Sequence, residues 1–522
     1  MSLDVAILGG GMAGGLLARQ LHREVPAARI AIFERSNESG FKVGESLVEL
    51  GSHYLVRRLG LSRYLYQHHL PKNGLRYFFD DSERNAELAQ MSELGTVNLP
   101  FHPSFQLDRA RFDTDLLEMN ASEGVEIRRG ARVTQLHLEE GSKRHHLEVE
   151  QRGRSETRSA RWVVDASGRS GLVARERGWR VRETAHSVQA VWGRFEGVAD
   201  VDDWQQWGEA FGERVRHTSR GISTLHFCYP GYWIWVIPLR GGLTSIGVVG
   251  HLQKRLAALR SEAGFRAFLE EHRALASLLV HAKAVDTASL RQLAHGTRHF
   301  FHADRIGLTG ESAAFADPLY SPGADFIALA NDFLCDLICH DLGDETEAGW
   351  QKRLPLFDEF MRFRLEAALR LYRGLYGGLG SYEFMRLKWD FDIASYHNLW
   401  VWPYLLGEYT QPSFLRRQLR QKRFVLQALA NFSDAFQKVE AHLRENGTYY
   451  RANLGRFSHG LENIDFLEKV GLPRPRRAEL ERTTAIFDGV RRGALRLLDR
   501  EAEAASPEIV PLSALMGSQP IV

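Results

Sequence analysis

Glycines and one acidic residue near the N-terminus have the types and spacing that hold a dinucleotide cofactor. The glycines follow the pattern Gly9-x-Gly11-x-x-Gly14. Gly9 permits a tight turn, Gly11 lets the backbone approach a pyrophosphate, and Gly14 lets a helix and a strand pack closely. Glu34 follows at a suitable distance to accept hydrogen bonds from ribose hydroxyls. The pattern alone does not separate NAD from FAD, and a chance glycine turn is the alternative.

The elements expected around these glycines place them at one edge of a parallel sheet. Residues 3–8 are almost entirely apolar and predict a buried strand, and residues 16–22 predict a helix. The start of that helix offers free N–H groups and a positive dipole end to phosphates. Residues 29–33 predict a second strand that leads into Glu34. Residues 162–170 run again from a strand into a glycine turn, where a second cofactor contact belongs.

Length and pattern changes divide the 522 residues into several domains. We expect a nucleotide-binding α/β domain over residues 1–185 and 286–340. Alternating aromatic-rich strands predict an inserted domain of β-sheet and helix over residues 186–285. Apolar residues at helical spacing predict a mostly helical domain over residues 341–522.

Composition argues against several classes of protein. A formal net charge of +2 disfavours a nucleic-acid partner and a polybasic membrane anchor. No apolar run approaches the ~18 to 20 residues of a membrane span, and we expect no secretory signal. Three cysteines cannot form a disulfide framework, and Cys335, Cys339 and His340 lack the further ligands that a metal site needs. We therefore expect a cytoplasmic protein without a metal centre.

Several segments together resemble the FAD-binding skeleton of aromatic-hydroxylase-type flavoproteins, over roughly residues 1–340. They are the N-terminal glycine turn with Glu34, Val43-Gly44-Glu45-Ser46, Gln106-x-x-Arg109-x-x-Phe112-Asp113, Asp165-Ala166-Ser167-Gly168, and Asp317-Pro318-Leu319 with Gly323. Residues 231–238, Gly-Tyr-Trp-Ile-Trp-Val-Ile-Pro, narrow this, because they look like the WxWxIP motif of flavin-dependent halogenases. Tyr320 stands where tryptophan-type members carry a glutamate, which favours the phenol- or pyrrole-type members.

The resemblance implies a fold class and an activity. The fold is α/β, with a FAD-binding Rossmann-like domain, an inserted β-sheet substrate domain and a mostly helical C-terminal region. Reduced FAD comes from a separate flavin reductase, and with oxygen it turns chloride or bromide into hypohalous acid. That acid halogenates an electron-rich aromatic substrate, free or bound to a carrier protein, in secondary metabolism.

The same resemblance implies roles for particular residues. Lys72 matches the lysine that holds or directs hypohalous acid near the substrate, and Trp233 and Trp235 separate flavin from substrate. Ser321 and Gly323 match the halide-binding loop. The implied cofactor-binding residues are Gly9, Gly11, Met12, Ala13, Gly14, Glu34, Lys42, Glu45, Ser46, Gln106, Arg109, Asp165, Gly310, Glu311, Asp317 and Gly323.

The residues taken alone leave simpler interpretations open. Lys72 lies in Leu70-Pro71-Lys72-Asn73-Gly74, which also predicts a turn with a solvated lysine. Trp233 and Trp235 alternate on one strand and therefore share a face, as core tryptophans also do.

Two positions depart from the family pattern. The family binds halide partly with backbone N–H groups at and just before the loop glycine, but Pro322 precedes Gly323 and has no N–H. Glu311 follows Gly310 where the family has aspartate. Because of these departures, a second hypothesis stays open: a halide-independent flavin monooxygenase, oxidase or dehydrogenase on the same fold. A third is a flavin-binding scaffold without catalysis.

Two features of the helical half have alternative interpretations. The aromatic cluster either lines a substrate pocket or packs a helical core; its members are Trp389, Tyr396, His397, Trp400 and Trp402. The basic run over residues 416–423 is either a docking face for a carrier protein or a solvated helix face.

His102 and His226 are possible general bases, although nothing in their spacing selects them.

Overall fold

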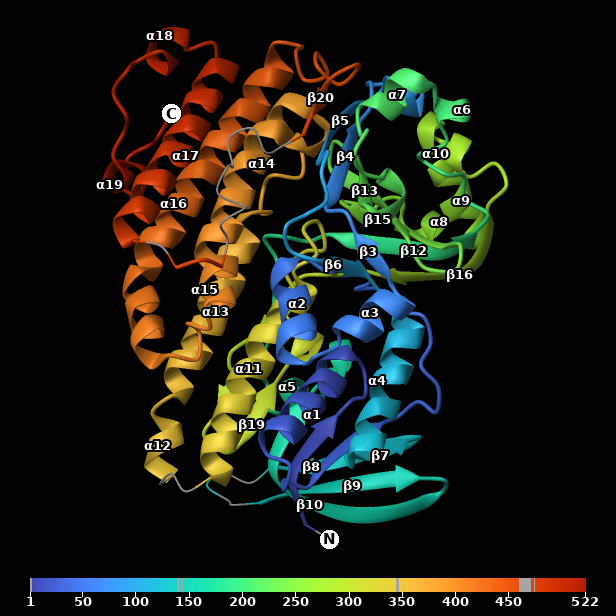
Figure 1. The fold of residues 1–522 in the computed structure, drawn as a ribbon, viewed down its shortest axis with the longest axis vertical. Coiled ribbons are helices and arrows are strands. Elements are labelled where there is room, and N and C mark those ends of the chain that lie inside the picture. Colours follow the sequence, from blue (N-terminus) through green and yellow to red (C-terminus); the bar gives the residue numbers. More distant parts are fainter. Residues whose placement is uncertain (1, 139–140, 142–143, 344–346, 460–470, 474) are drawn as a thin grey trace.

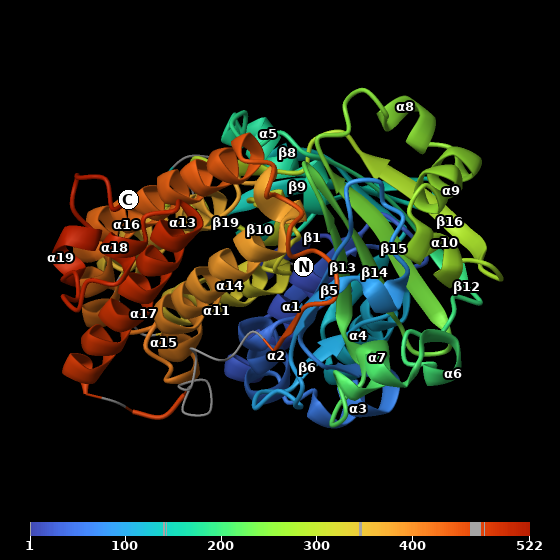
Figure 2. The same ribbon diagram turned by 90° about the horizontal axis from the view of Figure 1, so that it is seen from above.

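The chain folds into two β-sheets flanked by a group of long helices (Figure 1). The computed structural model describes residues 2–138, 141, 144–343, 347–459, 471–473 and 475–522. In Figure 1 the first sheet lies at the bottom, the second sheet at the upper right, and the C-terminal helices along the left side. Figure 2 shows from above that these helices and the second sheet stand on opposite sides of α1 and α2.

The first sheet carries the N-terminal glycine turn. Its strand order is β18 (Phe301–His302), β19 (Ile306–Leu308), β10 (Arg154–Asp165), β1 (Leu3–Leu8), β2 (Ile30–Glu34) and β7 (Glu126–Arg129). β1 pairs in parallel with both β2 and β10, and β8 (Ala131–His137) with β9 (His145–Gln151) extends β10 as an antiparallel ribbon. Helices α1 (Met12–Glu24), α4 (Arg109–Glu123), α5 (Leu172–Glu176) and α11 (Gly323–Leu342) belong to this part. The predicted strands at residues 3–8 and 29–33 are therefore confirmed.

The second sheet collects strands from three parts of the chain. Its order is β16 (Lys283–Leu290), β12 (Gln189–Glu196), β15 (Leu243–Gly250), β14 (Tyr232–Pro238), β13 (Thr224–Tyr229), β4 (Leu75–Phe79), β5 (Ser92–Gly95) and β20 (Phe457–Ser458). Residues 186–285 supply the centre of this sheet, whereas β4, β5 and β20 come from outside that range. Short helices surround it: α6 (Trp204–Trp207), α7 (Glu209–Glu213), α8 (Leu256–Leu259), α9 (Glu262–Glu270) and α10 (Arg273–Leu278). The three predicted domain ranges stay a prediction.

Long helices dominate the C-terminal region, as the sequence predicts. They are α13 (Leu354–Arg370), α14 (Tyr382–Tyr396), α16 (Pro412–Glu445) and α17 (Arg476–Leu497), with shorter helices α12 (Glu347–Gln351), α15 (Trp402–Leu405), α18 (Glu501–Ala504) and α19 (Leu512–Leu515). Phe360, Phe363 and Ala367, which recur at helical spacing, are buried. Within the described residues, no helix combines the length and the apolar character that a membrane crossing needs. The α/β class with a helical C-terminal region is confirmed.

The segment around Lys72 differs from its prediction. β3 (Leu70–Lys72) is a strand that pairs with β6 (Ser104–Gln106), with Lys72 opposite Ser104. Asn73 and Gly74 connect β3 to β4, and Gly74 takes the positive φ of +67° that favours glycine. Lys72 is consequently buried and not a solvated turn residue. The short helices α2 (Glu49–His53) and α3 (Ser62–His68) precede it along the chain.

Candidate active site

Two adjoining cavities form a groove at the carboxyl ends of β1, β2 and β10, the edge at which open α/β sheets bind ligands. The outer cavity measures about 730 Å³ and is lined by Gly9, Gly11, Met12, Ala13, Glu34, Lys42, Arg109, Gly310 and Glu311, among others. The inner cavity measures about 140 Å³ and is lined by Glu45, Ser46, Trp233, Trp235, Ser321 and Gly323, among others. Met12, Arg109 and Glu311 line both, so the two cavities adjoin.

The glycine turn fits a phosphate-bearing cofactor. A Cβ on Gly9 would lie 2.4 Å from the Ala166 carbonyl oxygen, and one on Gly14 would lie 2.1 Å from the Gly9 carbonyl oxygen. Both glycines are therefore required by packing. A Cβ on Gly11 would meet no protein atom closer than 3.7 Å, because this residue faces the outer cavity. Gly11 thus lets a ligand approach the N-terminus of α1, as a dinucleotide pyrophosphate requires.

Charged side chains are held in fixed positions along the outer cavity. Glu34 accepts hydrogen bonds from the backbone N–H of Gly10 at 2.7 Å and of Ser36 at 2.9 Å. These bonds place its carboxylate at the end of β2, where ribose hydroxyls are bound in this type of fold. Lys42 and Arg109 both contact Asp113, at 2.9 Å and 3.1 Å.

Four of the residues predicted to bind the cofactor do not line the groove. Gly14 packs below it. Asp165 accepts the N–H groups of Ser167 and Val173 and thereby shapes the second glycine turn, and burial raises its pKa. Gln106 accepts a hydrogen bond from Thr224 at 3.1 Å. The fourth, Asp317, lies behind the wall of the inner cavity and is fully buried.

Trp233 and Trp235 form one wall of the inner cavity. Their ring centroids are 5.9 Å apart on β14. Trp233 Nε1 donates a hydrogen bond to the Tyr376 hydroxyl at 3.0 Å, and that hydroxyl donates to Asp317 Oδ2 at 2.7 Å. His186 Nε2 lies 2.6 Å from the same oxygen. Asp317 therefore orients Trp233 through Tyr376, a residue of the helical region that the sequence patterns did not single out.

Glu45 and Glu311 contribute carboxylates that already have arginine partners. Glu45 is buried and lies 3.0 Å from Arg194 of β12. Burial raises the pKa of Glu45 to about 7 despite this partner. Glu311 contacts Arg169 at 3.0 Å at the junction of the two cavities. Neither arginine was predicted as a site residue, because each lies more than 100 positions from its partner.

The segment Ser321-Pro322-Gly323 begins helix α11 at the inner cavity. The Ser321 N–H donates to the Pro318 carbonyl at 2.9 Å, and Pro322, which lacks an N–H, is the N-cap. Among the described residues, no acceptor pairs with the N–H groups of Gly323 and Ala324. Both residues line the inner cavity. Two donors at the positive end of a 20-residue helix therefore remain for an anion there.

Lys72 lines a third cavity and contacts Ser46, which lines the inner cavity. Its Nζ donates hydrogen bonds to Ser46 Oγ and to the Leu47 carbonyl, both at 2.7 Å. Ser46 Oγ also accepts a hydrogen bond from Ser321 at 3.0 Å. Burial lowers the pKa of Lys72 from its ordinary value near 10.5 to about 7, although Glu49 and Asp325 favour its charged form. The amine is therefore partly neutral near pH 7.

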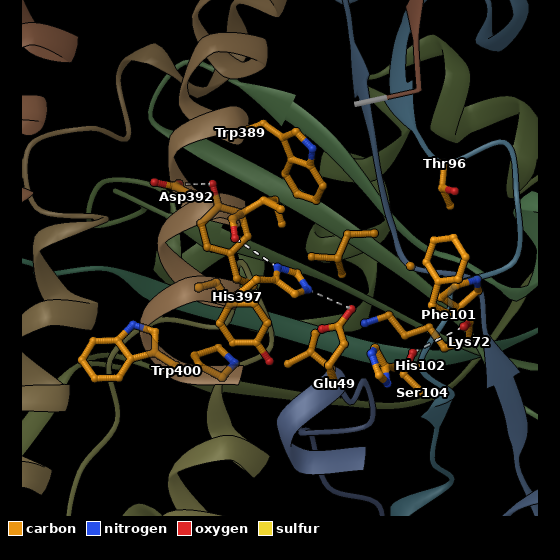
Figure 3. Close-up of a pocket in the computed structure, with 18 of the residues that line it drawn as sticks. Glu49, Lys72, Thr96, Phe101, His102, Ser104, Trp389, Asp392, His397 and Trp400 are labelled. Carbon is orange, nitrogen blue, oxygen red and sulfur yellow. Dashed lines mark hydrogen bonds and ion pairs between the residues drawn. The ribbon is translucent and has the colours of Figure 1, made fainter. Parts of the chain in front are cut away.

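This third space, the aromatic cavity, measures about 170 Å³ (Figure 3). Trp389, Tyr396, His397 and Trp400 line it, so four members of the aromatic cluster form a pocket wall. Trp402 packs elsewhere and donates its Nε1 hydrogen bond to the Leu472 carbonyl. In Figure 3, Lys72 and Trp400 lie at opposite sides of the cavity, with Glu49 and His397 between them.

The two histidines with no assigned role lie in different cavities. His102 lines the aromatic cavity, near Lys72 in Figure 3. His226 lines the inner cavity and stacks on Tyr77 with centroids 4.6 Å apart. Burial lowers the pKa of His226 to about 3, so it is neutral. Glu49 Oε1 and His397 Nε2 are 3.9 Å apart in the aromatic cavity.

Comparisons of this chain with a family model and with known proteins agree on one family. The family model described as FAD binding domain matches residues 2–319. The chain is 27% identical over 447 residues to a protein named flavin-dependent halogenase chlA from Dictyostelium discoideum, covering 78% of this chain and 71% of that protein. It is 26% identical over 342 residues to a 1H-pyrrole-2-carbonyl peptidyl-carrier-protein chlorinase from Pseudomonas fluorescens, covering 61% of this chain and 72% of that protein.

A solved structure supports the same fold. The structure of halogenase PltM matches with a TM-score of 0.69 at 16% identity, and the match covers 96% of this chain and 99% of that one. The outer cavity with its open Gly11 suits the cofactor that these matches name. The chain belongs to the FAD binding domain family, among the flavin-dependent halogenases, which are FAD-dependent oxidoreductases.

Proposed function

We propose that this protein halogenates an electron-rich aromatic substrate, using hypohalous acid made from chloride or bromide. The observation that carries the proposal is the position of Lys72. A buried amine with a pKa of about 7 stands between the cofactor groove and the aromatic cavity. Its contact with Ser46, which lines the inner cavity, connects the two spaces.

Different steps of the proposed reaction take place in different cavities. FAD, once reduced by a flavin reductase, supplies with O₂ the oxidising power that halide needs. The free N–H groups of Gly323 and Ala324 bind halide in the inner cavity. Trp233 and Trp235 keep the substrate from the cofactor. The neutral amine of Lys72 receives hypohalous acid, and the aromatic carbon gains the halogen while its proton leaves with the hydroxyl as water.

The test is aerobic turnover with a flavin reductase, with and without bromide, followed by mass spectrometry of a phenol or pyrrole substrate. We expect the bromine isotope pattern only when bromide is present. Lys72→Ala should lower product formation about 100-fold or more while FAD stays bound, because the oxidant is then no longer held next to the ring and misplacing a reacting group costs about that much. Lys254→Ala, which removes an exposed lysine, is the matched control. Unchanged halogenation by Lys72→Ala would refute the mechanism.

A second candidate function rests on Pro322. The loop lacks one of the N–H donors expected at a halide site, so a halide-independent monooxygenase, oxidase or dehydrogenase is the alternative. Product formation that does not change between halide-free buffer and saturating bromide would select this alternative. A strict requirement for halide would exclude it.

A further inference from the structure

Within the part of the chain that the structure describes, one buried arginine of the aromatic cavity has no anionic partner. Arg364 lies on α13 and is only 3% exposed, and it lines the cavity with Ala368, Leu371 and Tyr372. Arg364 and Ala368 lie one turn apart on α13, and Leu371 and Tyr372 directly follow its last residue, so the C-terminal end of α13 forms this wall. Among the described residues, no hydrogen bond or ion pair engages the Arg364 guanidinium, and its Nε is fully enclosed without an acceptor.

Aromatic rings cover the faces of this guanidinium. Its carbon lies 4.4 Å from the Trp400 ring centroid and 5.2 Å from that of Phe326. Stacking uses the faces of the planar group and leaves the N–H groups at its edge for a ligand. A planar fork of donors matches a carboxylate, which accepts two parallel hydrogen bonds.

The surrounding charges do not neutralise Arg364. Asp325 is the carboxylate whose charge acts on it most strongly, but the two side chains form no ion pair. Asp325 instead accepts the N–H of Gly51 at 2.9 Å, and burial raises its pKa to about 7. It therefore carries only part of a negative charge near neutral pH. A buried, permanently charged arginine without a partner is costly, and an anion in the cavity removes that cost.

We propose that Arg364 binds the carboxylate of the substrate, which makes the substrate a free aromatic acid with an electron-rich ring. The proposal rests on the proposed function, because it assigns the substrate of that same site. Arg364 stacks on Trp400, and Figure 3 shows Trp400 across the cavity from Lys72. A carboxylate held at Arg364 therefore directs the ring towards the amine of Lys72. A carrier-bound acyl group is a thioester and lacks this negative charge.

The experiment measures equilibrium binding to the FAD-loaded protein, without turnover, by quenching of tryptophan fluorescence. The probes are 4-hydroxybenzoate, 4-hydroxybenzamide and the N-acetylcysteamine thioester of the same acid. We expect the acid to bind at least about tenfold more tightly than the amide or the thioester, as a charge-assisted hydrogen bond provides. Arg364→Met should remove this preference, and Arg364→Lys should keep part of it. Arg362→Met is the matched control, because this neighbour on α13 is half exposed and pairs with Asp358.

Equal binding of acid and amide by the native protein, or no binding of either, would overturn the proposal, and this comparison needs no variant to fold. Equally tight binding of the thioester would also overturn it. Competitive displacement of the acid by bromide would instead make Arg364 a halide site. A preserved preference for the acid without any halogenated product would refute the proposed function but not the carboxylate site.

Discussion

Lys72 Nζ and Ser46 Oγ are 2.7 Å apart, and their hydrogen bond crosses the partition between the cofactor groove and the aromatic cavity. Ser46 directly follows Glu45 on the cofactor side, whereas Lys72 ends strand β3 on the other side. The Ser46 hydroxyl also accepts a hydrogen bond from Ser321, in the segment Ser321-Pro322-Gly323. A single hydroxyl thus connects the loop that begins α11 with the amine that faces the aromatic cavity.

The proposed role of Lys72 predicts a pH dependence. Burial lowers its pKa to about 7, so the neutral, nucleophilic amine becomes more abundant as pH rises through 7. Halogenated product per reduced flavin in a single turnover should therefore rise with pH, and should fall about tenfold per unit below the pKa. Lys72→Arg, which stays charged, should lose this dependence. Burial raises the pKa of Glu45 and of Asp325 to about 7 as well. If the Lys72→Arg variant kept the pH dependence, these carboxyls and not Lys72 would be its cause.

Gly11 and Gly14 should respond differently to the same substitution. A Cβ on Gly14 would lie 2.1 Å from a backbone oxygen, so Gly14→Ala should lower the free energy of unfolding of the apoprotein by about 1–3 kcal/mol. Gly11→Ala should leave that stability nearly unchanged, because its Cβ meets only ordinary contacts. It should nevertheless weaken FAD binding, since the methyl group enters the phosphate site. Denaturant unfolding and FAD titration measure the two effects, and equal effects of both substitutions would contradict this assignment.

Pro322→Ala should improve halide binding if the start of α11 is the halide site. The substitution restores one N–H beside the free donors of Gly323 and Ala324, and φ of −76° suits alanine as well as proline. A hydrogen bond to an ion contributes about 1.5–3 kcal/mol, so the bromide KM should fall at least about tenfold. Steady-state rates at varied bromide test this. A bromide KM that does not change would place halide elsewhere.

Tyr376→Phe should destabilise the tryptophan wall of the inner cavity. The substitution leaves the buried Trp233 Nε1 without its acceptor, which should cost about 1–3 kcal/mol in the free energy of unfolding. Tyr66→Phe, at a half-exposed tyrosine, should change stability by less than about 0.5 kcal/mol. In a Trp233→Phe background the cost of Tyr376→Phe should shrink, because the unpaired donor is gone. A cost that stays the same in that background would mean that Tyr376 acts only through Asp317.

Local spacing determined the parts of this protein that the sequence predicts. The first two strands, the glycine turn and the shared face of Trp233 and Trp235 follow from residues that are close in the chain, where strand alternation and turn geometry are fixed by a few neighbours. The family resemblance added the position of Lys72, although the local pattern suggested a solvated turn there.

Tertiary structure alone decided the chemical state of the site. The pKa of Lys72 depends on its burial at the end of β3, next to β6 and the loop that holds Ser46. The Ser321 hydroxyl that donates to Ser46 comes from 275 residues further along the chain. The orientation of Trp233 and the position of Arg364 in the wall of the aromatic cavity also depend on the C-terminal region. Desolvation and ion pairing depend on distances in space, and these distances exist only once the sheets and helices have packed.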